Sequence, residues 1–446
     1  MFKKILIANR GEIAVRIIRA CKELGIRSVA IHSKADADAM HVKMAEESIC
    51  IGGNHSRESY LNIPAIITAA ELTGAEAIHP GYGFLSENSR FVRILEDCNI
   101  TFIGPKAEHI EIMGDKIKAR ETISETGIPL VPGSKGKITN TSVIKKTANN
   151  IGYPLIIKAS SGGGGKGMKV VKDHTTLLEQ YELAKSEAKA NFGNDEVYLE
   201  KFLEHPKHIE FQIFADKHGN VIHLGERDCS VQRRHQKIIE EAPASDINLT
   251  EKQKVLNAIT DAMKKIGYVG AGTIEMLYEN DKFYFIEMNT RLQVEHPVTE
   301  MITGVDIVLE QIKVASGLKL EIKQEDITFT GHSIECRINA ENSKSFKPSP
   351  GIISTYHIPG GPGVRVDSAA FDKYRVLPYY DSLIGKLIVH ANNRDLAIAR
   401  MLRALDEFII EGIDTTLDLH KKIIKTKQFQ SNTYNINWLE EYLAEK

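Results

Sequence analysis

A run of glycines constrains this chain more than any other feature of its sequence. Residues 162–167 read Gly-Gly-Gly-Gly-Lys-Gly, and glycines in such number disfavour both helix and strand, because glycine loses the most conformational freedom on ordering. The apolar runs at 154–158 and 168–171 predict a strand before this loop and a strand after it. Backbone N–H groups of such a loop can close over phosphates, and Lys158 and Lys166 add positive charge. The alternative is a flexible surface hairpin.

The loop fits neither of two common nucleotide-binding motifs. Gly162, Gly164 and Gly167 satisfy G-x-G-x-x-G, but that fingerprint opens a helix, whereas a strand is expected here. A P-loop needs Ser or Thr after Gly-Lys and a glycine five positions earlier, and this chain has Gly167 and Ser160 there. We therefore expect a phosphate-covering flap between two strands.

The remaining pattern divides into an alternating part and a hairpin-rich part. Helical stretches separate five short apolar runs in the first part, which predicts a parallel α/β domain. These predicted strands span 4–8, 27–32, 48–51, 75–78 and 101–104. Later runs pair around turn-forming residues and predict two hairpins, 209–215 with 221–225 and 272–278 with 283–289. After about residue 331 we expect mostly antiparallel strands and then helices, with 396–409 the clearest helix.

Composition narrows the possible partners and compartment. The length of 446 residues suggests about three domains. The 57 basic and 59 acidic residues give a net charge of 57 − 59 = −2, which disfavours binding to nucleic acids or membrane surfaces. No apolar run approaches the ~18 residues of a membrane span, and the N-terminus is too short for a signal sequence. The five cysteines form no C-x-x-C pair, so we expect a cytoplasmic protein without disulfides or a zinc site.

A carboxylate pair predicts a metal site. Glu275 and Glu287 lie on the two strands of one predicted hairpin, and Asn289 points to the same face as Glu287. If the two glutamates are paired across the hairpin, their oxygens can hold a hard cation such as Mg²⁺. Two solvated carboxylates are the alternative, but the strands are largely apolar and burying unpaired carboxylates is costly. The prediction depends on register, since a slip of one residue would separate the pair.

Two further polar segments contain candidate site residues. Arg291, Gln293 and Glu295 alternate, so an extended segment would aim all three one way and set an anion-binding guanidinium beside a potential general base. Residues 232–237 are expected to form a basic patch after a strand, which alone is usually solvated surface. His208 and His235 lack metal-ligand spacing, and taken singly each is expected to be structural.

Together these motifs resemble the biotin carboxylases, a family of ATP-grasp enzymes that includes the first-half-reaction subunit of acetyl-CoA carboxylase. The resemblance runs from Ile5 to about Tyr442, and it departs at Ser161, where another glycine is expected. The motifs that carry it are IANRGEIA (7–14), HPGYGFLSEN (79–88), MGDK (113–116), KASSGGGGKGM (158–168), ERDCSVQRRHQK (226–237) and EMNTRLQVEH (287–296). It implies an N-terminal α/β domain at 1–114, an ATP-grasp domain at 115–330 with a lid at about 133–203, and a C-terminal domain at 331–446.

The resemblance also assigns roles to residues. For ATP it implies Lys116, Lys158, Gly164, Gly165, Glu200, Lys201, Leu203, His208, Gln232, His235, Glu275 and Glu287. For two Mg²⁺ or Mn²⁺ ions it implies Glu275, Glu287 and Asn289, and for bicarbonate Lys237, Arg291, Gln293, Val294 and Glu295. Arg337 and Tyr82 would face biotin, and Arg291, Glu295, Lys237 and Arg337 would be catalytic, with Glu295 as the base.

Expected partners follow from the resemblance as well. The nearest matches to a biotin-attachment Met-Lys-Met are at 168–170 and 263–265, in a predicted hairpin and a predicted helix, so a separate biotin carboxyl carrier protein is expected. Carboxyltransferase subunits and a homodimer are also expected. Three rivals remain: another ATP-grasp ligase such as a carbamoyl-phosphate or amino-acid ligase, a nucleotide-binding regulatory module, and the biotin carboxylase subunit of pyruvate or another acyl-CoA carboxylase. The last is left open because acceptor choice lies in the carboxyltransferase.

Overall fold

The N-terminal part is the predicted five-stranded parallel sheet. The computed structural model describes residues 1–134, 136–138, 141–160 and 167–444. The sheet has the order β3-β2-β1-β4-β5, and every neighbouring pair is parallel. Its strands are β1 Lys4–Ile7, β2 Arg27–Ser33, β3 Glu47–Gly52, β4 Ala77–His79 and β5 Thr101–Phe102, and its main helices are α1 Gly11–Glu23, α2 Met40–Met44, α3 Ile63–Thr73 and α4 Ser89–Asp97. The order reverses between β1 and β4, so the loops after these strands face a shared crevice, where open α/β sheets bind ligands.

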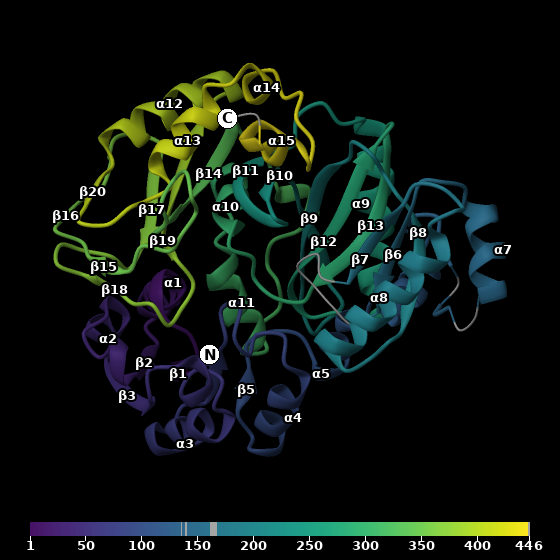
Figure 1. The fold of residues 1–446 in the computed structure, drawn as a ribbon. Coiled ribbons are helices and arrows are strands. Elements are labelled where there is room, and N and C mark those ends of the chain that lie inside the picture. The colour runs from purple at the N-terminus through teal and green to yellow at the C-terminus, as the bar shows by residue number, and fades with distance from the viewer. Residues whose placement is uncertain (135, 139–140, 161–166, 445–446) are drawn as a thin grey trace.

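The glycine loop joins two paired strands, as the sequence predicts. Strands β6 (Leu155–Ala159) and β7 (Met168–Val171) are antiparallel, and β8 (Val197–Lys201) completes a three-stranded sheet. Helices α7 (Thr141–Ile151) and α8 (Leu177–Phe192) pack against this sheet and enclose a hydrophobic cluster of their own, at the right of Figure 1. Residues 161–166, with Gly164 and Gly165, lie outside the described residues.

An eight-stranded antiparallel sheet forms the centre of the molecule (Figure 1). Its order is β13-β12-β9-β10-β11-β14-β19-β17, and both predicted hairpins lie in it. The strands are β9 Lys207–Ala215, β10 Val221–Arg233, β11 Gln236–Ala242, β12 Gly270–Glu279, β13 Lys282–Asn289, β14 His332–Asn339, β17 Val364–Ser368 and β19 Leu383–Ala391. Pairing of β11 with β14 carries the sheet across residue 331, so the later strands extend the sheet begun by the earlier ones.

Helices cover both faces of the central sheet. Helix α9 (Leu249–Ile266) packs near the β13 end, α15 (Trp438–Ala444) packs on β10, and α12 (Arg394–Glu407) packs on β14 and β19 with α13 (Leu417–Ile424) against it. Helix α12 begins and ends two residues before the predicted helix 396–409. Helix α10 (His296–Thr303) crosses β10, β11, β14 and β19 on the opposite face. The remaining elements are α5 Ala107–Gly114, α6 Lys116–Ser124, α11 Ile307–Ala315, α14 Lys427–Gln430, β15 Gly351–Ile352, β16 Thr355–His357, β18 Arg375–Val376 and β20 Ile409–Glu411.

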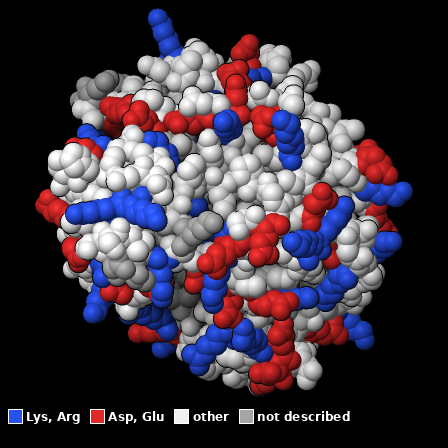
Figure 2. Space-filling model, turned by 90° about the vertical axis from the view of Figure 1, so that its right-hand side faces the viewer, with Lys and Arg blue, Asp and Glu red and all other residues white. Residues whose placement is uncertain are grey.

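The surface is mixed in charge. On the face in Figure 2, basic and acidic side chains are interspersed among neutral residues. None of the described helices is both long and apolar enough to span a membrane.

Candidate active site

One cleft collects nearly all of the predicted site residues. Its volume is about 1140 Å³, and the N-terminal crevice, the lid strands, the central sheet and residues 379–383 all contribute to its walls. The predicted residues that line it are Tyr82, Lys116, Lys158, Glu200, Lys201, Leu203, His208, Gln232, His235, Lys237, Glu275, Glu287, Asn289, Arg291, Gln293, Val294 and Arg337. Glu295 is fully buried beneath the cleft, where it bonds Lys237 and Arg337.

The carboxylate pair has the register that a metal site requires. Glu275 on β12 lies directly opposite Glu287 on β13, so the cross-strand prediction is confirmed. Asn289 donates from Nδ2 to Glu275 Oε1 over 2.8 Å, and Lys116 Nζ lies 3.4 Å from Glu287. Both carboxylates line the cleft, and oxygen ligands of this kind suit Mg²⁺. The donor set therefore fits the divalent cation expected from the sequence.

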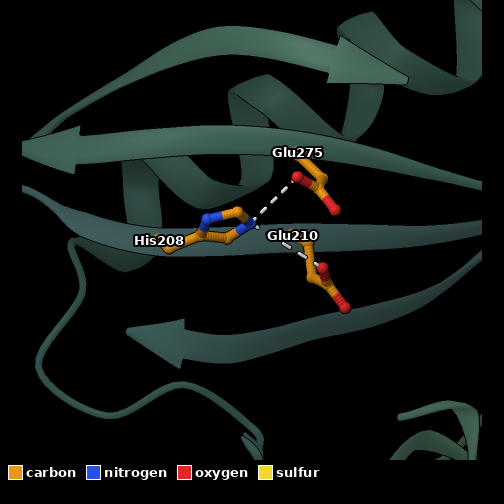
Figure 3. Close-up of side chains that lie close together, drawn as sticks. All are labelled: His208, Glu210 and Glu275. Atoms are coloured by element: carbon orange, nitrogen blue, oxygen red, sulfur yellow. Dashed lines mark ion pairs between the residues drawn. The ribbon is translucent and has the colours of Figure 1, made fainter. Parts of the chain in front are cut away.

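His208 lies between two carboxylates on neighbouring strands (Figure 3). Its Nε2 is 3.3 Å from Glu275 and 3.9 Å from Glu210, and its Nδ1 lies 3.0 Å from Gln232 Nε2. An amide nitrogen only donates, so Nδ1 accepts and Nε2 carries the proton toward the carboxylates. The ligand atoms of His208, Glu210 and Glu275 lie within 4.8 Å of one another. Sequence spacing could not reveal this cluster because Glu275 comes from another strand.

Lys237 binds three carboxylates at once. Its Nζ lies 2.5 Å from Glu210, 2.7 Å from Glu295 and 2.9 Å from Glu275. Burial lowers the pKa of this ammonium, but the three carboxylates outweigh burial and hold it well above its ordinary value. Lys237 is therefore a fixed positive charge at neutral pH.

Glu295 is the most enclosed of the predicted catalytic groups. It accepts hydrogen bonds from Lys237 and, over 2.9 Å, from Arg337 Nη2. Burial would raise the pKa of Glu295, but Lys237, Arg337 and Arg227 hold it well below the usual range. The carboxylate is thus ionised at neutral pH and ready to accept a proton, although the same cations weaken it as a base.

The segment that carries Arg291, Gln293 and Glu295 is not extended. It bends at Arg291 and turns at residues 294–295, and Glu295 precedes the first residue of α10. The expectation of one shared direction is therefore wrong, because burial of Glu295 under α10 requires the turn. Arg291 and Gln293 nevertheless both line the cleft, and Arg291 Nη1 lies 3.4 Å from Gln293 Oε1.

The basic residues at 232–237 also differ from expectation. They do not simply follow a strand but occupy the end of β10, a turn with positive φ at Arg234 and His235, and the start of β11. Gln232, His235 and Lys237 line the cleft, so this part of the patch is not ordinary solvated surface.

The three-stranded sheet of β6, β7 and β8 contributes a charged group to the cleft. Lys158 on β6 lies 2.5 Å from Glu200 on β8, and Arg120 of α6 also contacts Glu200. Lys201 donates to the carbonyl of Tyr153 over 2.6 Å. Lys158 is thereby held at the wall of the cleft.

Tyr82 approaches the cleft from the N-terminal crevice. Asn9 Nδ2 donates to the backbone carbonyls of Pro80 and Tyr82, which fixes this loop against β1. The Tyr82 hydroxyl contacts Glu12, which in turn pairs with Lys386 over 3.3 Å. Tyr82 and Arg337 thus line one cleft from different parts of the chain.

Several residues that support the site were not predicted. Glu87 accepts from Arg291 Nε over 2.7 Å, and Glu210 binds both Lys237 and the buried Arg227. A signal for Glu210 exists, because it alternates with His208 and Gln212 along an otherwise apolar strand. No local sequence pattern indicates that Glu87 pairs with Arg291 or that Arg120 pairs with Glu200.

Three family models together match nearly the whole chain. The family models "Biotin carboxylase, N-terminal domain", "Carbamoyl-phosphate synthase L chain, ATP binding domain" and "Biotin carboxylase C-terminal domain" match residues 1–110, 115–323 and 335–441. "Biotin carboxylase" of Haemophilus influenzae is 56% identical over 445 residues, which is 100% of this chain and 99% of that protein. "Biotin carboxylase 1" of Bacillus subtilis is 55% identical and covers 99% of each chain.

Solved structures agree with the sequence relatives. The Campylobacter jejuni biotin carboxylase complexed with β,γ-ATP superposes with a TM-score of 0.96 at 52% identity, over 99% of both chains. The biotin carboxylase domain dimer of Hydrogenobacter thermophilus 2-oxoglutarate carboxylase, bound to MgADP, ADP and bicarbonate, gives 0.94 at 52% identity, over 99% of this chain and 98% of that one.

Proposed function

The chain belongs to the biotin carboxylase family, and from this premise we propose that it uses ATP and bicarbonate to carboxylate biotin on a separate carrier protein. The observation that carries this proposal is the cleft, which is lined by a phosphate-suited lysine set and a carboxylate pair and has the buried Glu295 directly beneath Lys237 and Arg337 of its wall. Neither a regulatory module nor a general ATP-grasp ligase needs Arg291, Glu295 and Arg337 together.

We assign the neutralisation of phosphate charge to the nucleotide end of the cleft. Lys116 and Lys158 line this end and would provide positive charge for the phosphates. The flap with Gly164 and Gly165 that the sequence predicts lies outside the described residues and would close over the phosphates. Glu275, Glu287 and Asn289 would hold Mg²⁺ or Mn²⁺, which supplies Lewis-acid neutralisation of phosphate charge. His208 and Glu200 orient this end by holding Glu275 and Lys158.

Bicarbonate is assigned to the centre. Arg291, Gln293, the Val294 backbone and Lys237 would hold the anion, and Glu295 would take its proton while it attacks the γ-phosphorus. Proton uptake by Glu295 requires Lys237 and Arg337 to share their hydrogen bonds with the substrates, since these cations lower its pKa. The product of this step is carboxyphosphate with ADP as leaving group.

Biotin is assigned to the side nearest Tyr82. Carboxyphosphate would release CO₂ there, and the departing phosphate would remove the proton from the ureido nitrogen. Arg337 lines the cleft and would stabilise the negative charge that develops on the ureido oxygen.

The partners and the pathway are inferred from the family. We infer a biotin carboxyl carrier protein, carboxyltransferase subunits and a homodimer, with acetyl-CoA as final acceptor and fatty acid synthesis as the purpose. All five cysteines are free, which suits a cytoplasmic location. A second candidate is a subunit of a different carboxylase, because solved relatives include biotin carboxylase units of 2-oxoglutarate and pyruvate carboxylases at 51–52% identity.

The test uses the purified chain with ATP, Mg²⁺, bicarbonate and free biotin. ADP release that requires bicarbonate and rises with biotin, together with acid-labile ¹⁴C on biotin, supports the proposal. Turnover that ignores biotin but accepts ammonia or an amino acid would favour another ATP-grasp ligase. Co-purification with the native carboxyltransferase then identifies the acceptor.

A further inference from the structure

A buried acid with no hydrogen-bond partner lies behind the catalytic arginine. Glu335 on β14 is fully buried, and among the described residues neither of its carboxyl oxygens has a hydrogen-bond partner. Ile388 lies opposite it on β19, and the adjoining surface of α10 contributes an apolar cluster with Val298 and Ile302. An ionised carboxylate in such surroundings would be costly, so the neutral acid is the favoured form.

The neighbouring strand presents the complementary group. Glu240 on β11 is directly opposite Glu335 on β14, so their side chains share one face of the sheet. Glu240 Oε1 accepts from Arg337 Nε over 2.5 Å, while its Oε2 is buried without a partner among the described residues. The neutral Glu335 thus needs an acceptor for its proton, and Oε2 of Glu240 is an acceptor without a donor.

Burial keeps one proton in this pair against the nearby cations. Arg337 and Lys386 face Glu335 from β14 and β19, Glu295 faces it from the start of α10, and Lys237 and Cys229 face Glu240. Burial, with smaller contributions from neighbouring carboxylates, raises the pKa of Glu335 well above its ordinary value, although Lys386 opposes this. Burial likewise raises the pKa of Glu240, which Arg337 partly offsets, to about 7.

We propose that Glu240 and Glu335 share a single proton, donated from Glu335 to Glu240 Oε2, and that this acid pair positions Arg337 for biotin. The inference rests on the proposed role of Arg337. Arg337 is held between Glu240 and Glu295, so the charge on Glu240 sets how strongly it competes with a ligand for the guanidinium. With the proton present, Glu240 holds the Nε side of the Arg337 guanidinium but leaves enough of its positive charge to bind the ureido oxygen of biotin. Loss of the proton strengthens the hold of Glu240 and weakens biotin binding.

The kinetic test compares Glu335→Gln, which stays neutral and keeps a donor, with Glu335→Leu, which has none. For the wild type, KM for biotin should rise as pH increases through the alkaline range. Glu335→Gln should keep a KM within about twofold of wild type at pH 7 and abolish this alkaline rise. Glu335→Leu should raise KM for biotin about 10-fold, the size of one lost hydrogen bond to a charged group, while biotin-free, bicarbonate-dependent ATPase activity stays unchanged. An alkaline rise that persists in Glu335→Gln overturns the proposal.

A spectroscopic test does not require activity. The infrared carbonyl band of a protonated carboxylic acid should be present in the wild type at pH 7.5 and should decrease in Glu335→Gln. Glu300→Gln is the matched control, because it removes a buried carboxylate held by Arg16 and Arg365 and should leave the band unchanged. An identical band in wild type and Glu335→Gln refutes the shared proton. A band that behaves as expected in an enzyme that ignores biotin would instead refute only the proposed function.

Discussion

Replacing Glu295 with glutamine separates its chemistry from its structural contribution. The carboxylate has two charged partners, Lys237 at 2.7 Å and Arg337 at 2.9 Å, and it is fully buried. Glutamine keeps the shape but cannot accept the proton of bicarbonate. Loss of a general base typically costs about 10²–10⁴ in rate, so kcat for biotin carboxylation should fall by at least 100-fold.

The same contacts predict that the variant folds. Breaking a buried pair can cost about 3–5 kcal/mol when a charge is left alone. Here Lys237 retains two carboxylates, Glu210 and Glu275, and Arg337 retains Glu240. The loss of unfolding free energy should therefore approach that of single charged hydrogen bonds, about 1.5–3 kcal/mol each.

The assay measures three quantities on one preparation. Biotin carboxylation is followed by ¹⁴C-bicarbonate incorporation, nucleotide affinity by calorimetric titration, and stability by urea unfolding. Glu241→Gln serves as the control, because Glu241 is equally buried but pairs with Arg394 and His332. That control should lose stability and keep kcat. Carboxylation by Glu295→Gln within tenfold of wild type, with ATP bound normally, would refute Glu295 as the base.

Four further outcomes are expected. Valine at Gly164 and Gly165 should raise KM for ATP at least tenfold by blocking close backbone approach to phosphate, and unchanged ATP kinetics would show a mere surface hairpin. Chelation of divalent cations should abolish ATPase activity, and Glu287→Gln should raise the Mg²⁺ concentration for half-maximal rate; an unaltered Mg²⁺ titration would remove Glu287 from the metal set. Burial raises the pKa of Asp367, but Arg365 and Lys386 outweigh burial and bring this pKa to about 2. The contribution of the Asp367 carboxylate to the stability of the fold is therefore full above about pH 4 and is lost as pH falls through 2. Asp367→Asn should reduce unfolding free energy at pH 7 by roughly 2 kcal/mol and flatten its decline in acid, and parallel urea-unfolding curves would contradict this. Mass spectrometry after co-expression with a biotin ligase should find no biotinylated lysine, and a stoichiometric adduct would exclude the separate carrier.

Sequence patterns were sufficient where the determinant is local. Strand alternation and turn residues located the hairpin that sets Glu275 opposite Glu287, because β-pairing across a short turn leaves few registers compatible with a buried face. The five parallel strands followed from apolar runs separated by helical stretches. In both cases the information lies within one supersecondary unit.

Local patterns failed where tertiary packing decides. Alternation of Arg291, Gln293 and Glu295 is typical of an extended segment, but the chain turns at the start of α10 and buries Glu295. Glu87 meets Arg291, and Arg120 meets Glu200, across separate layers of the fold, so no spacing rule could pair them. The continuation of the central sheet through β11 and β14 is equally non-local.

The buried charges explain why the site can be both rigid and reactive. Lys237 holds Glu210, Glu275 and Glu295 together, so one ammonium ties the metal-suited carboxylate to the proposed base. Through Glu295, Arg337 joins this group to Glu240 on β11. Removing the Lys237 charge would take one partner from each of three carboxylates in a region of low dielectric, where weakened pairing of an ion is more costly than in water. In the proposed mechanism, bicarbonate or biotin would replace a partner only by supplying an oxygen of its own, which would make the protein's internal ion pairs a template for the charges of the substrates.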